Sequence, residues 1–414
     1  MQISQYREKM RMDSTKTLQL YLEANEVARK EKISNVNQYI LKNPRKLTKE
    51  QLTAVIHQHE FIEKAKVKLG NLAQKFPLIG PPGVSLEQAS SEITANMKSS
   101  LLGNYEHILD LTGGFGMDTL SFAKYAKFVT YVEQNEQLAQ IVQHNFSLMS
   151  VSNVDFQVKS AEIFLDEVQK KYDWVYLDPA RRSSENQKLV KMTDLSPNFL
   201  ELASKIWKIT DRILLKLSPM IDLSQVQREV ANLREIIVVG IKNEVKEVLL
   251  VLEKGWNIPP VIQTINYLNE EKTQIFSFTQ KQEERILCAI GDPLTYIYEP
   301  NAPILKSGAF QEIGNRFGLI KLANNTHLYT STALIPDFPG RIFEIQAIHK
   351  PKKEVLLKEL GKPLFANIIS RNFGENGEKI AQKFQIKPKD DVTYLLFTQL
   401  KDEKKVVILA KKLV

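Results

Sequence analysis

Glycines and acidic residues cluster within an otherwise apolar stretch near position 113. In ILDLTGGFGMDTLSFA, which begins at Ile108, these residues are Asp110, Gly113, Gly114, Gly116 and Asp118. Glycine reaches positive φ angles and lets a ligand approach the backbone closely. Where such a turn leads into a helix, its N–H groups face the bound molecule and favour an anionic or polar group. The stretch predicts a ligand-binding turn, with a tight packing turn as the alternative.

The spacing of the glycines distinguishes this loop from two common nucleotide-binding loops. A dinucleotide-binding loop has the pattern G-x-G-x-x-G, whereas this loop contains G-G-F-G. A P-loop requires Gly-Lys followed by Ser or Thr, but Met117 and Asp118 stand there. An acidic residue before the loop, Asp110, suits a ligand with an ammonium group. S-adenosylmethionine carries an α-ammonium, a carboxylate and a sulfonium, and it fits this pattern.

Further polar residues follow the next two predicted strands. Glu133 ends the segment FVTYVE, 17 residues after Gly116. A carboxylate at the tip of that strand can accept hydrogen bonds from both ribose hydroxyls of an adenosine. Ala161 and Glu162 follow the segment VDFQVKS and are expected beside the adenine, although Glu162 also suits an ordinary helix start.

The fourth predicted strand ends in the sequence LDPARR. It would present Asp178 and Pro179 at the sheet edge where open α/β sheets bind ligands. We predict that Asp178 holds the acceptor of a transferred group and receives its proton, the alternative being a carboxylate that only shapes the loop. Arg181 and Arg182 would clamp a phosphate, because guanidinium groups match phosphate oxygens, or else form surface ion pairs. Lys216, on the fifth predicted strand, is a further candidate for this pocket.

Alternating strands and helices must position these residues. The predicted strands are 107–112, 128–133, 154–160, 174–179 and 212–218. Helical stretches separate them, as in a parallel sheet with right-handed crossovers. Two closing strands, 234–242 and 246–255, are joined by a short polar turn and should be antiparallel. The pattern predicts an α/β fold with a mostly parallel sheet and an antiparallel closing hairpin.

The segments on either side of this sheet have different patterns. The N-terminal segment has helical spacing, with Thr48 and Gln51 as a predicted capping box, until the proline-rich stretch FPLIGPPG ends it. After the sheet come a small, loop-rich α+β unit and a compact C-terminal α+β module. The predicted domains are residues 1–80, 85–255, 256–340 and 341–414.

The order and spacing of the motifs resemble those of class I S-adenosylmethionine-dependent methyltransferases. ILDLTGGFGMD matches their first motif, YVEQN the acidic second motif, SAE the adenine motif and LDPARR the fourth motif. The resemblance covers residues 85–255 and implies a Rossmann-like sheet that binds S-adenosylmethionine. The implied cofactor contacts are Asp110, Thr112, Gly113, Gly114, Gly116, Asp118, Glu133, Ala161 and Glu162. The implied catalytic residues are Asp178, Pro179 and Arg181.

Departures from related motifs restrict the acceptor. Enzymes of this kind that methylate exocyclic amines usually carry Asn/Asp-Pro-Pro and then an aromatic residue, but here Ala180 and Arg181 stand there. Carbon-5 pyrimidine methylases attack through a cysteine near this motif. Cys288 instead lies far downstream in the strand-like segment RILCAIGD and is expected in the core. Ring nitrogens, a purine carbon, ribose oxygens and acceptors outside nucleic acids remain.

A second resemblance concerns the end of the chain. The segment ANIISRNFGENGEKIAQKFQIK, which begins at Ala366, is similar to bacterial methyltransferase-like proteins with a THUMP-like C-terminal domain. That resemblance implies RNA modification. Arg371 beside an exposed Phe373 would suit an RNA phosphate and a stacked base, the alternative being a packed core Phe373.

The distribution of charge is consistent with an RNA partner. The chain has 414 residues and a formal net charge of +8, with +7 in residues 1–75, +7 in residues 341–414 and −6 between them. Solvated lysine faces would give the same distribution. We predict a methyltransferase that acts on structured RNA, tRNA or rRNA, through these basic flanks. The alternatives are a protein or small-molecule acceptor, and a non-catalytic RNA-binding scaffold with a cofactor pocket.

The remaining composition concerns location and metals. The charged N-terminus lacks the apolar core of a secretory signal, and the longest apolar runs fall short of the ~20 residues that span a bilayer. A single cysteine excludes an internal disulfide and a cysteine-based zinc site, and the histidines lack metal-binding spacing. These features predict a cytoplasmic protein with neither a metal site nor membrane contact.

Overall fold

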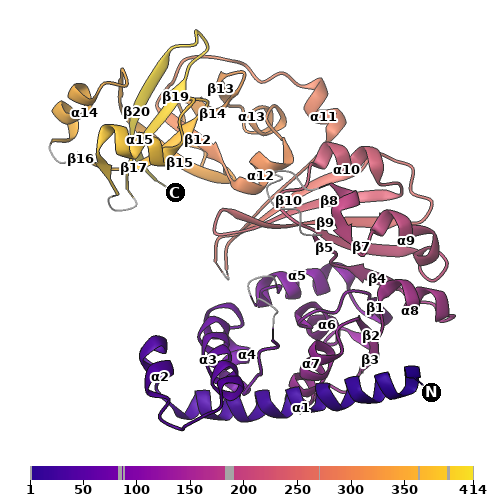
Figure 1. Ribbon diagram of the computed structural model, residues 1–414. Coiled ribbons are helices and arrows are strands. Elements are labelled where there is room, and N and C mark those ends of the chain that lie inside the picture. Colours follow the sequence, from indigo (N-terminus) through magenta and orange to yellow (C-terminus); the bar gives the residue numbers. More distant parts are fainter. Residues whose placement is uncertain are drawn as a thin grey trace. The chain divides into compact units, whose positions relative to one another are not determined.

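The computed structural model describes residues 2–82, 86, 89–181, 191–269, 271–361, 364–388 and 392–413. The chain divides into two compact units (Figure 1). The first comprises residues 1–217 and 252–255, and the second comprises residues 218–251 and 256–414. Within the described ranges, no helix combines the length and the apolar character needed to cross a lipid bilayer.

The first unit opens with helices that pack through small and branched apolar side chains. They are α1 (Gln2–Lys30), α2 (Val36–Lys42), α3 (Lys49–Lys68) and α4 (Asn71–Lys75). Helix α1 packs against α3 and α7 (Glu136–Leu148), as Figure 1 shows. At the start of α3, the Thr48 hydroxyl accepts a hydrogen bond from the Gln51 N–H, and the Gln51 side chain accepts one from the Thr48 N–H. The predicted capping box is confirmed.

Side-chain amides hold the proline-rich segment that follows these helices. Gln58 on α3 accepts a hydrogen bond from the Gly80 N–H (3.0 Å) and donates one to the Gly80 carbonyl (2.7 Å). Asn25 on α1 donates to the Leu78 carbonyl (2.9 Å) and to Gln58 (3.0 Å). A side chain at position 80 would overlap the ring of Phe61, since a Cβ there would lie 2.4 Å from it. Glycine is therefore required at position 80.

Asn145 on α7 binds the same segment at Ile79. Its Oδ1 accepts a hydrogen bond from the Ile79 N–H and its Nδ2 donates one to the Ile79 carbonyl, both at 2.9 Å. Both residues are buried. The segment thus obtains from side chains the backbone hydrogen bonds that a neighbouring strand would otherwise supply.

A parallel sheet forms the core of the first unit. Its strands run in the order β3 (Val154–Val158), β2 (Ala126–Glu133), β1 (Tyr105–Asp110), β4 (Trp174–Leu177) and β7 (Arg212–Leu217). Every neighbouring pair in this series is parallel. The associated helices are α5 (Glu92–Leu102), α6 (Met117–Phe122), α7, α8 (Ala161–Glu167) and α9 (Phe199–Ile206). The predicted α/β fold is confirmed, and strand β4 is buried along its whole length, as expected at the centre of a parallel sheet.

A hairpin follows helix α10 (Leu223–Glu229) along the chain. It consists of β8 (Leu233–Ile241) and β9 (Glu244–Glu253), which are neighbours in the sheet. Lys242 and Asn243 join them with φ angles of 50° and 65°. Positive φ at both turn residues is characteristic of a two-residue hairpin. The predicted antiparallel closing hairpin is therefore present.

Two further strands of the second unit follow the hairpin. Strand β10 (Val261–Tyr267) pairs with β8 in parallel, and β11 (Thr273–Thr279) pairs with β10 in antiparallel fashion. Strand β10 was not predicted from the sequence. Thr264 and Asn266 point into the core, where both hydrogen-bond to residues of β11. Because polar residues occupy the inward positions, the apolar alternation that normally reveals a strand is missing.

A second sheet contains most of the remaining strands. Its order is β13 (Ile320–Ala323), β14 (Thr326–Ser331), β12 (Tyr296–Pro300), β15 (Gly340–His349), β20 (Lys405–Lys412), β19 (Thr393–Gln399) and β17 (Asn367–Arg371). The other elements are α11 (Gln280–Arg285), α12 (Ala302–Ser307), α13 (Glu312–Arg316), α14 (Lys353–Leu360), β16 (Leu364–Phe365), α15 (Gly377–Phe384) and β18 (Ile386–Lys387). Since β12 pairs with β15, residues on both sides of position 340 share this sheet. The four predicted domain limits stay predictions.

The segment RILCAIGD, which contains Cys288, is not the strand that its apolar residues suggested. The Cys288 N–H donates to the side chain of Gln311 (2.9 Å) rather than to a neighbouring strand. The thiol donates to the Leu319 carbonyl (3.2 Å), and the residue is buried, as expected for a core cysteine.

We expect replacement of Asn145 by alanine to destabilise the first unit. Asn145→Ala leaves the buried N–H and carbonyl of Ile79 without partners, and each unsatisfied group costs about 1–3 kcal/mol. Urea denaturation should therefore show a loss of about 3 kcal/mol. The control is Gln143→Ala, at an exposed position on the same helix. Equal midpoints for the two variants would contradict the role of Asn145.

Candidate active site

A pocket lies at the carboxyl ends of the parallel strands of the first unit. Six of the residues predicted from the sequence are among those that line it. They are Thr112, Gly114, Glu133, Ala161, Glu162 and Asp178. They follow four different strands, β1, β2, β3 and β4, and the parallel pairing brings these strand ends to one edge. Open α/β sheets bind ligands at this edge.

The glycine loop after β1 is held against strand β2. The Gly113 N–H donates to the Val132 carbonyl (2.9 Å), and the Tyr131 hydroxyl donates to the Gly114 carbonyl (2.7 Å). A Cβ at position 113 would lie 2.1 Å from the Tyr131 ring, so only glycine allows this approach. Gly114 has a φ of +52°, which also favours glycine. Gly113 supports the loop from beneath, whereas Gly114 faces the pocket.

The Glu133 carboxylate is fixed at the pocket by two backbone groups. Its Oε2 accepts a hydrogen bond from the Gly114 N–H (3.1 Å), and its Oε1 accepts one from the Asn135 N–H (2.8 Å). Each carboxylate oxygen has two lone pairs, so each can accept a further hydrogen bond from a ligand. The two backbone groups therefore orient the Glu133 carboxylate and leave it able to accept hydrogen bonds from a ligand.

Asp178 also lines the pocket, where Lys216 and Thr112 position it. The Asp178 N–H donates to the Thr112 hydroxyl (2.6 Å), which ties the end of β4 to the loop after β1. Lys216 on β7 forms an ion pair with the Asp178 carboxylate. The Lys216 side chain is 11% exposed and that of Asp178 is 34% exposed, so the carboxylate is the more accessible partner. Lys216 is thus a site residue that the sequence indicated only weakly.

Asp110 does not reach the pocket wall, in contrast to the sequence expectation. Its Oδ1 accepts a hydrogen bond from the Thr112 N–H (3.0 Å), and its Oδ2 accepts one from the Thr119 hydroxyl (2.5 Å). Burial raises the pKa of Asp110 to about 7, against the effect of these hydrogen bonds. Asp110 therefore stabilises the turn from within, and its predicted ammonium contact has no geometric support.

Asp118 is likewise directed into the protein. It lies 3.2 Å from the Nζ of the fully buried Lys98 on α5. The hydroxyls of Ser90 (2.8 Å) and Tyr176 (2.7 Å) donate to its other oxygen. Burial alone would raise the pKa of Asp118, but Lys98, Lys216 and these hydroxyl groups outweigh it and lower the pKa. Lys98 could not be found from sequence, because a lysine on a helix normally faces solvent.

The other predicted residues have structural or peripheral positions. Gly116 precedes α6 with a φ of +79°, and a Cβ there would lie 2.7 Å from Val142. Pro179 is buried, and Arg181 is exposed on the short strand β5 (Ala180–Arg181). Within the part of the chain that the structure describes, neither residue lines the pocket. Arg182 lies outside the described residues. Among the described side chains, no group of three His, Cys, Asp or Glu residues is arranged to hold a metal.

Comparisons with known proteins agree with this geometry. Residues 91–201 match the family described as conserved hypothetical protein 95, residues 296–339 match a ferredoxin-like domain and residues 340–412 match a THUMP domain-like family. The chain is also similar to a crystal structure of a "putative methyltransferase from Porphyromonas gingivalis W83", with 31% identity and a TM-score of 0.84. The similarity covers 95% of this chain and 98% of that one. The chain belongs to this methyltransferase family. The predicted resemblance to methyltransferases with a THUMP-like C-terminal domain is confirmed.

Two curated relatives match parts of this chain. The 23S rRNA (uracil(1939)-C(5))-methyltransferase RlmD of Vibrio cholerae is 39% identical over 83 residues, which are 19% of each chain. An RNA methyltransferase of Mycoplasma mobile, described as uncharacterized, is 31% identical over 102 residues, which are 25% of this chain and 28% of its own. The chain thus spans less than a third of either relative.

The raised pKa of Asp110 predicts a pH dependence of stability. An ordinary aspartate titrates near pH 4, so between about pH 4 and pH 7 the folded chain binds a proton that the unfolded chain has lost. Stability therefore falls as pH rises through this window, by up to about 1.4 kcal/mol per pH unit. Asp110→Asn keeps the shape of the side chain but cannot titrate. Between pH 5 and pH 7, the free energy of unfolding of this variant should therefore fall by about 2 kcal/mol less than that of the unmodified protein.

Urea denaturation at several pH values measures this difference. The control Asp155→Asn changes an exposed aspartate on β3 and should keep the pH dependence of the parent. An Asp110→Asn variant with the same pH dependence as the parent would show that Asp110 has an ordinary pKa.

Proposed function

We propose that the chain transfers a methyl group from S-adenosylmethionine to RNA. The observation that carries the proposal is the meeting of Glu133, the Gly113–Gly114 turn and Asp178 at the carboxyl edge of one parallel sheet. Membership of a methyltransferase family supports the reaction type. A cytoplasmic location, where such an enzyme would meet RNA, is part of the same proposal.

The residues on one side of the pocket fit the adenosine part of the cofactor. Glu133 presents a carboxylate to which both ribose hydroxyls can donate, and Gly114 leaves the adjoining backbone uncovered. Ala161 and Glu162, at the start of α8, would lie beside the adenine. The enclosed volume is about 200 Å³. Because pockets for whole ligands usually exceed about 300 Å³, part of the cofactor would lie outside the enclosed space.

The residues on the other side fit an acceptor. When bound, S-adenosylmethionine would supply a methyl group activated by the sulfonium. Thr112 fixes the backbone of Asp178, and Lys216 holds its carboxylate. Asp178 would orient the nucleophilic atom of the acceptor and take its proton, since an ionised carboxylate accepts but does not donate. Methyl transfer needs little further assistance from a protein beyond in-line placement.

RNA is the acceptor class that the relatives and the charge favour. Both curated relatives are described as RNA methyltransferases, although this chain covers only 19% and 28% of their lengths. Residues 340–412 match a THUMP domain-like family, and residues 341–414 carry a net charge of +7. Positive segments of this kind attract the phosphate backbone.

Carbon-5 of uracil, the target named for the Vibrio relative, is not proposed for this chain. Cys288 is the single cysteine and is not among the residues that line the pocket. Burial raises the pKa of its thiol, which disfavours the nucleophilic thiolate. A ring nitrogen, a purine carbon or a ribose oxygen fits the available side chains better.

Cofactor binding tests the role of Glu133. Glu133→Gln replaces the carboxylate that would accept hydrogen bonds from two ribose hydroxyls with a neutral amide. Hydrogen bonds to charged groups contribute about 1.5–3 kcal/mol. Isothermal titration should therefore show S-adenosylmethionine binding at least about tenfold more weakly. The control is Glu106→Gln, which changes an exposed glutamate near the start of β1, at the opposite end of the strand. Equal affinities for the two variants would reject this placement of the adenosine.

Methyl transfer tests the role of Asp178. Total RNA and total protein from a strain that lacks this protein are incubated with labelled S-adenosylmethionine and the purified chain. We expect ribonuclease-sensitive label, and at least about a hundredfold loss of rate in Asp178→Asn, the lower range for removal of a general base. Protease-sensitive label would favour a protein acceptor instead. Cofactor binding without label in any fraction would favour a non-catalytic RNA-binding scaffold.

A further inference from the structure

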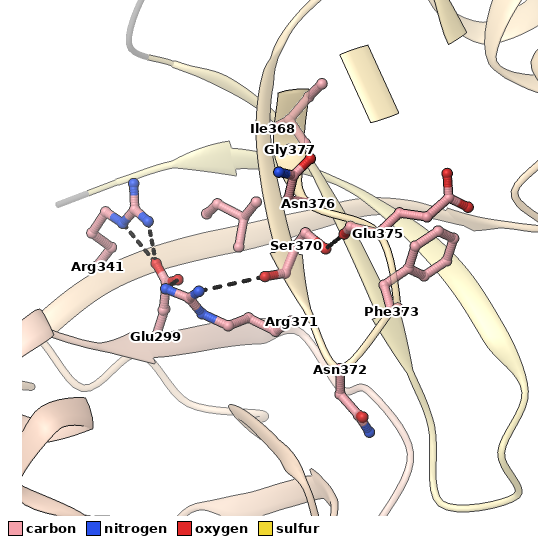
Figure 2. Close-up of a pocket in the computed structure, with 12 residues that line it drawn as sticks. Glu299, Arg341, Ile368, Ser370, Arg371, Asn372, Phe373, Glu375, Asn376 and Gly377 are labelled. Atoms are coloured by element: carbon pink, nitrogen blue, oxygen red, sulfur yellow. Dashed lines mark hydrogen bonds and ion pairs between the residues drawn. The ribbon is translucent and has the colours of Figure 1, made fainter. Parts of the chain in front are cut away.

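A second cavity, of about 530 Å³, lies in the C-terminal sheet. It is formed by the edge strand β17 and the loop 372–376 that follows it, with side chains from β12 and β15 (Figure 2). Its volume is within the range of about 300–1,000 Å³ found for small-molecule sites. No part of the proposed methyl-transfer pocket contributes to it.

Two arginines and one buried carboxylate form one side of this cavity. Arg341 Nε lies 2.7 Å from Glu299 Oε2, and Arg371 Nη2 lies 2.8 Å from Glu299 Oε1. The Glu299 side chain is 1% exposed, whereas those of Arg341 and Arg371 are 29% and 38% exposed. Figure 2 shows both guanidinium groups meeting at Glu299. The carboxylate therefore holds the two cations in place from beneath.

Glu299 uses only part of the hydrogen-bonding capacity of these arginines. A guanidinium has five N–H donors in a planar fork. Within the described chain, the Nη1 of Arg371 has only a long contact of 3.4 Å to the Ser370 carbonyl, whereas its Nε is buried and has no hydrogen-bond partner. The Nη1 donors of Arg371 thus remain for a ligand, on a side chain that is 38% exposed and ion-paired with Glu299. Planar guanidinium groups match the oxygens of a phosphate or a carboxylate.

The charges around the cavity favour an anion. Glu375 is the second carboxylate at the cavity, and the Nζ of Lys383 lies 2.8 Å from it. Lys405 adds a further cation beside the loop, where its Nζ lies 5.1 Å from the centre of the Phe373 ring. The lining itself holds two arginines and two glutamates, and Lys383 and Lys405 lie beside it. The partly exposed guanidinium groups are the part of this lining that would attract a phosphate.

The loop that closes the cavity is internally fixed. The Ser370 hydroxyl donates to the Glu375 carbonyl (2.6 Å), and the Asn376 side chain accepts from the Lys379 N–H (2.9 Å) to cap α15. Asn372 donates to the Thr326 hydroxyl (3.1 Å) on β14. A preformed wall reduces the entropy lost on binding.

Phe373 does not offer the stacking surface that the sequence suggested. The residue is buried, and its ring packs edge-on against Phe397 with the ring centres 5.3 Å apart. It belongs to the core beneath the loop. Recognition at this cavity must therefore rely on charge and hydrogen bonds rather than on stacking with this ring.

We propose that this cavity binds a phosphate group of RNA, with Arg341 and Arg371 as the principal donors. The phosphate chemistry follows from the cavity itself, whereas the choice of RNA rests on the proposed function. A phosphodiester would present its two non-bridging oxygens to the two guanidinium groups. The cavity leaves room for the attached sugar. Glu299 acts as a positioning residue that keeps the two arginines together.

Binding of a fluorescently labelled, short single-stranded RNA to the full chain tests the proposal. Arg341→Gln and Arg371→Gln should each weaken binding about tenfold, because each removes a charge-assisted contact. Each should also lower the slope of log affinity against log salt by about 0.7, the value for one lost phosphate contact on a single strand. The control Arg285→Gln removes the same charge from an exposed position on α11 and should change neither quantity.

Two further measurements distinguish an RNA phosphate from a free anion, and a lost contact from a folding defect. If adenosine monophosphate or inorganic phosphate competes at the same concentration as the RNA, the site takes a free anion and the assignment to RNA is overturned. Arg371→Lys keeps the charge but loses the fork, so weaker binding by this variant, with an unchanged unfolding midpoint, supports the proposal. Unchanged RNA affinity in both glutamine variants, or an equal loss in Arg285→Gln, overturns it.

The same variants distinguish this proposal from the proposed function. RNA binding that depends on Arg371 in a chain that transfers no methyl group would leave the phosphate site standing and reject the reaction. Methyl transfer to RNA with an affinity indifferent to Arg341 and Arg371 would leave the reaction standing and reject the site.

Discussion

The register of strand β1 between β2 and β4 is the constraint on which the candidate active site depends. Asp110, the last residue of β1, pairs with Tyr131 on one side and with Tyr176 on the other. The residues just beyond these positions therefore emerge at one level of the sheet edge. A register shift of one residue would turn every side chain of the strand to the other face. The convergence of Glu133 and Asp178 is thus a property of backbone pairing before it is one of side chains.

Buried polar residues stabilise the edge from within. Asp110 accepts a hydrogen bond from the Thr112 N–H in the turn after β1. The ion pair of Asp118 and Lys98 joins α6 to α5. Burying charges is costly, and a pair repays this cost only when further hydrogen bonds complete it, as Ser90 does here for Asp118. Removing one partner would leave an uncompensated charge in the interior. These carboxylates support the pocket, although their positions in the sequence resemble ligand contacts.

A related arrangement recurs in the C-terminal sheet. There a nearly inaccessible carboxylate, Glu299, orients two partly exposed arginines, while in the first unit Lys216 orients the more exposed Asp178. In both places, the group with less access to solvent fixes the direction of the group that faces a cavity. Preorganisation of this kind lowers the entropy that a ligand must overcome on binding.

Much of the fold was predictable because its signals are local. The strands of the parallel sheet are short strand-like segments separated by helical stretches, the capping box at Thr48 needs only a four-residue pattern, and the glycine loop has a recognisable spacing. Strand β10 was not predictable, because Thr264 points inward and conceals the period of two. Local patterns report backbone conformation, and they fail where a polar side chain at an inward position bonds a neighbouring strand, as Thr264 does with the Phe276 carbonyl.

The sequence by itself determined the strands of the parallel sheet, their order, and that acidic residues follow these strands. Only the tertiary structure decided which of these residues face the pocket, and it selected Glu133 and Asp178 but turned Asp110 and Asp118 inward. It also paired Asn145 with Ile79, which lie 66 residues apart in the chain. The physical reason is that a side chain's direction depends on partners contributed by distant segments, and these partners exist only once the segments have packed.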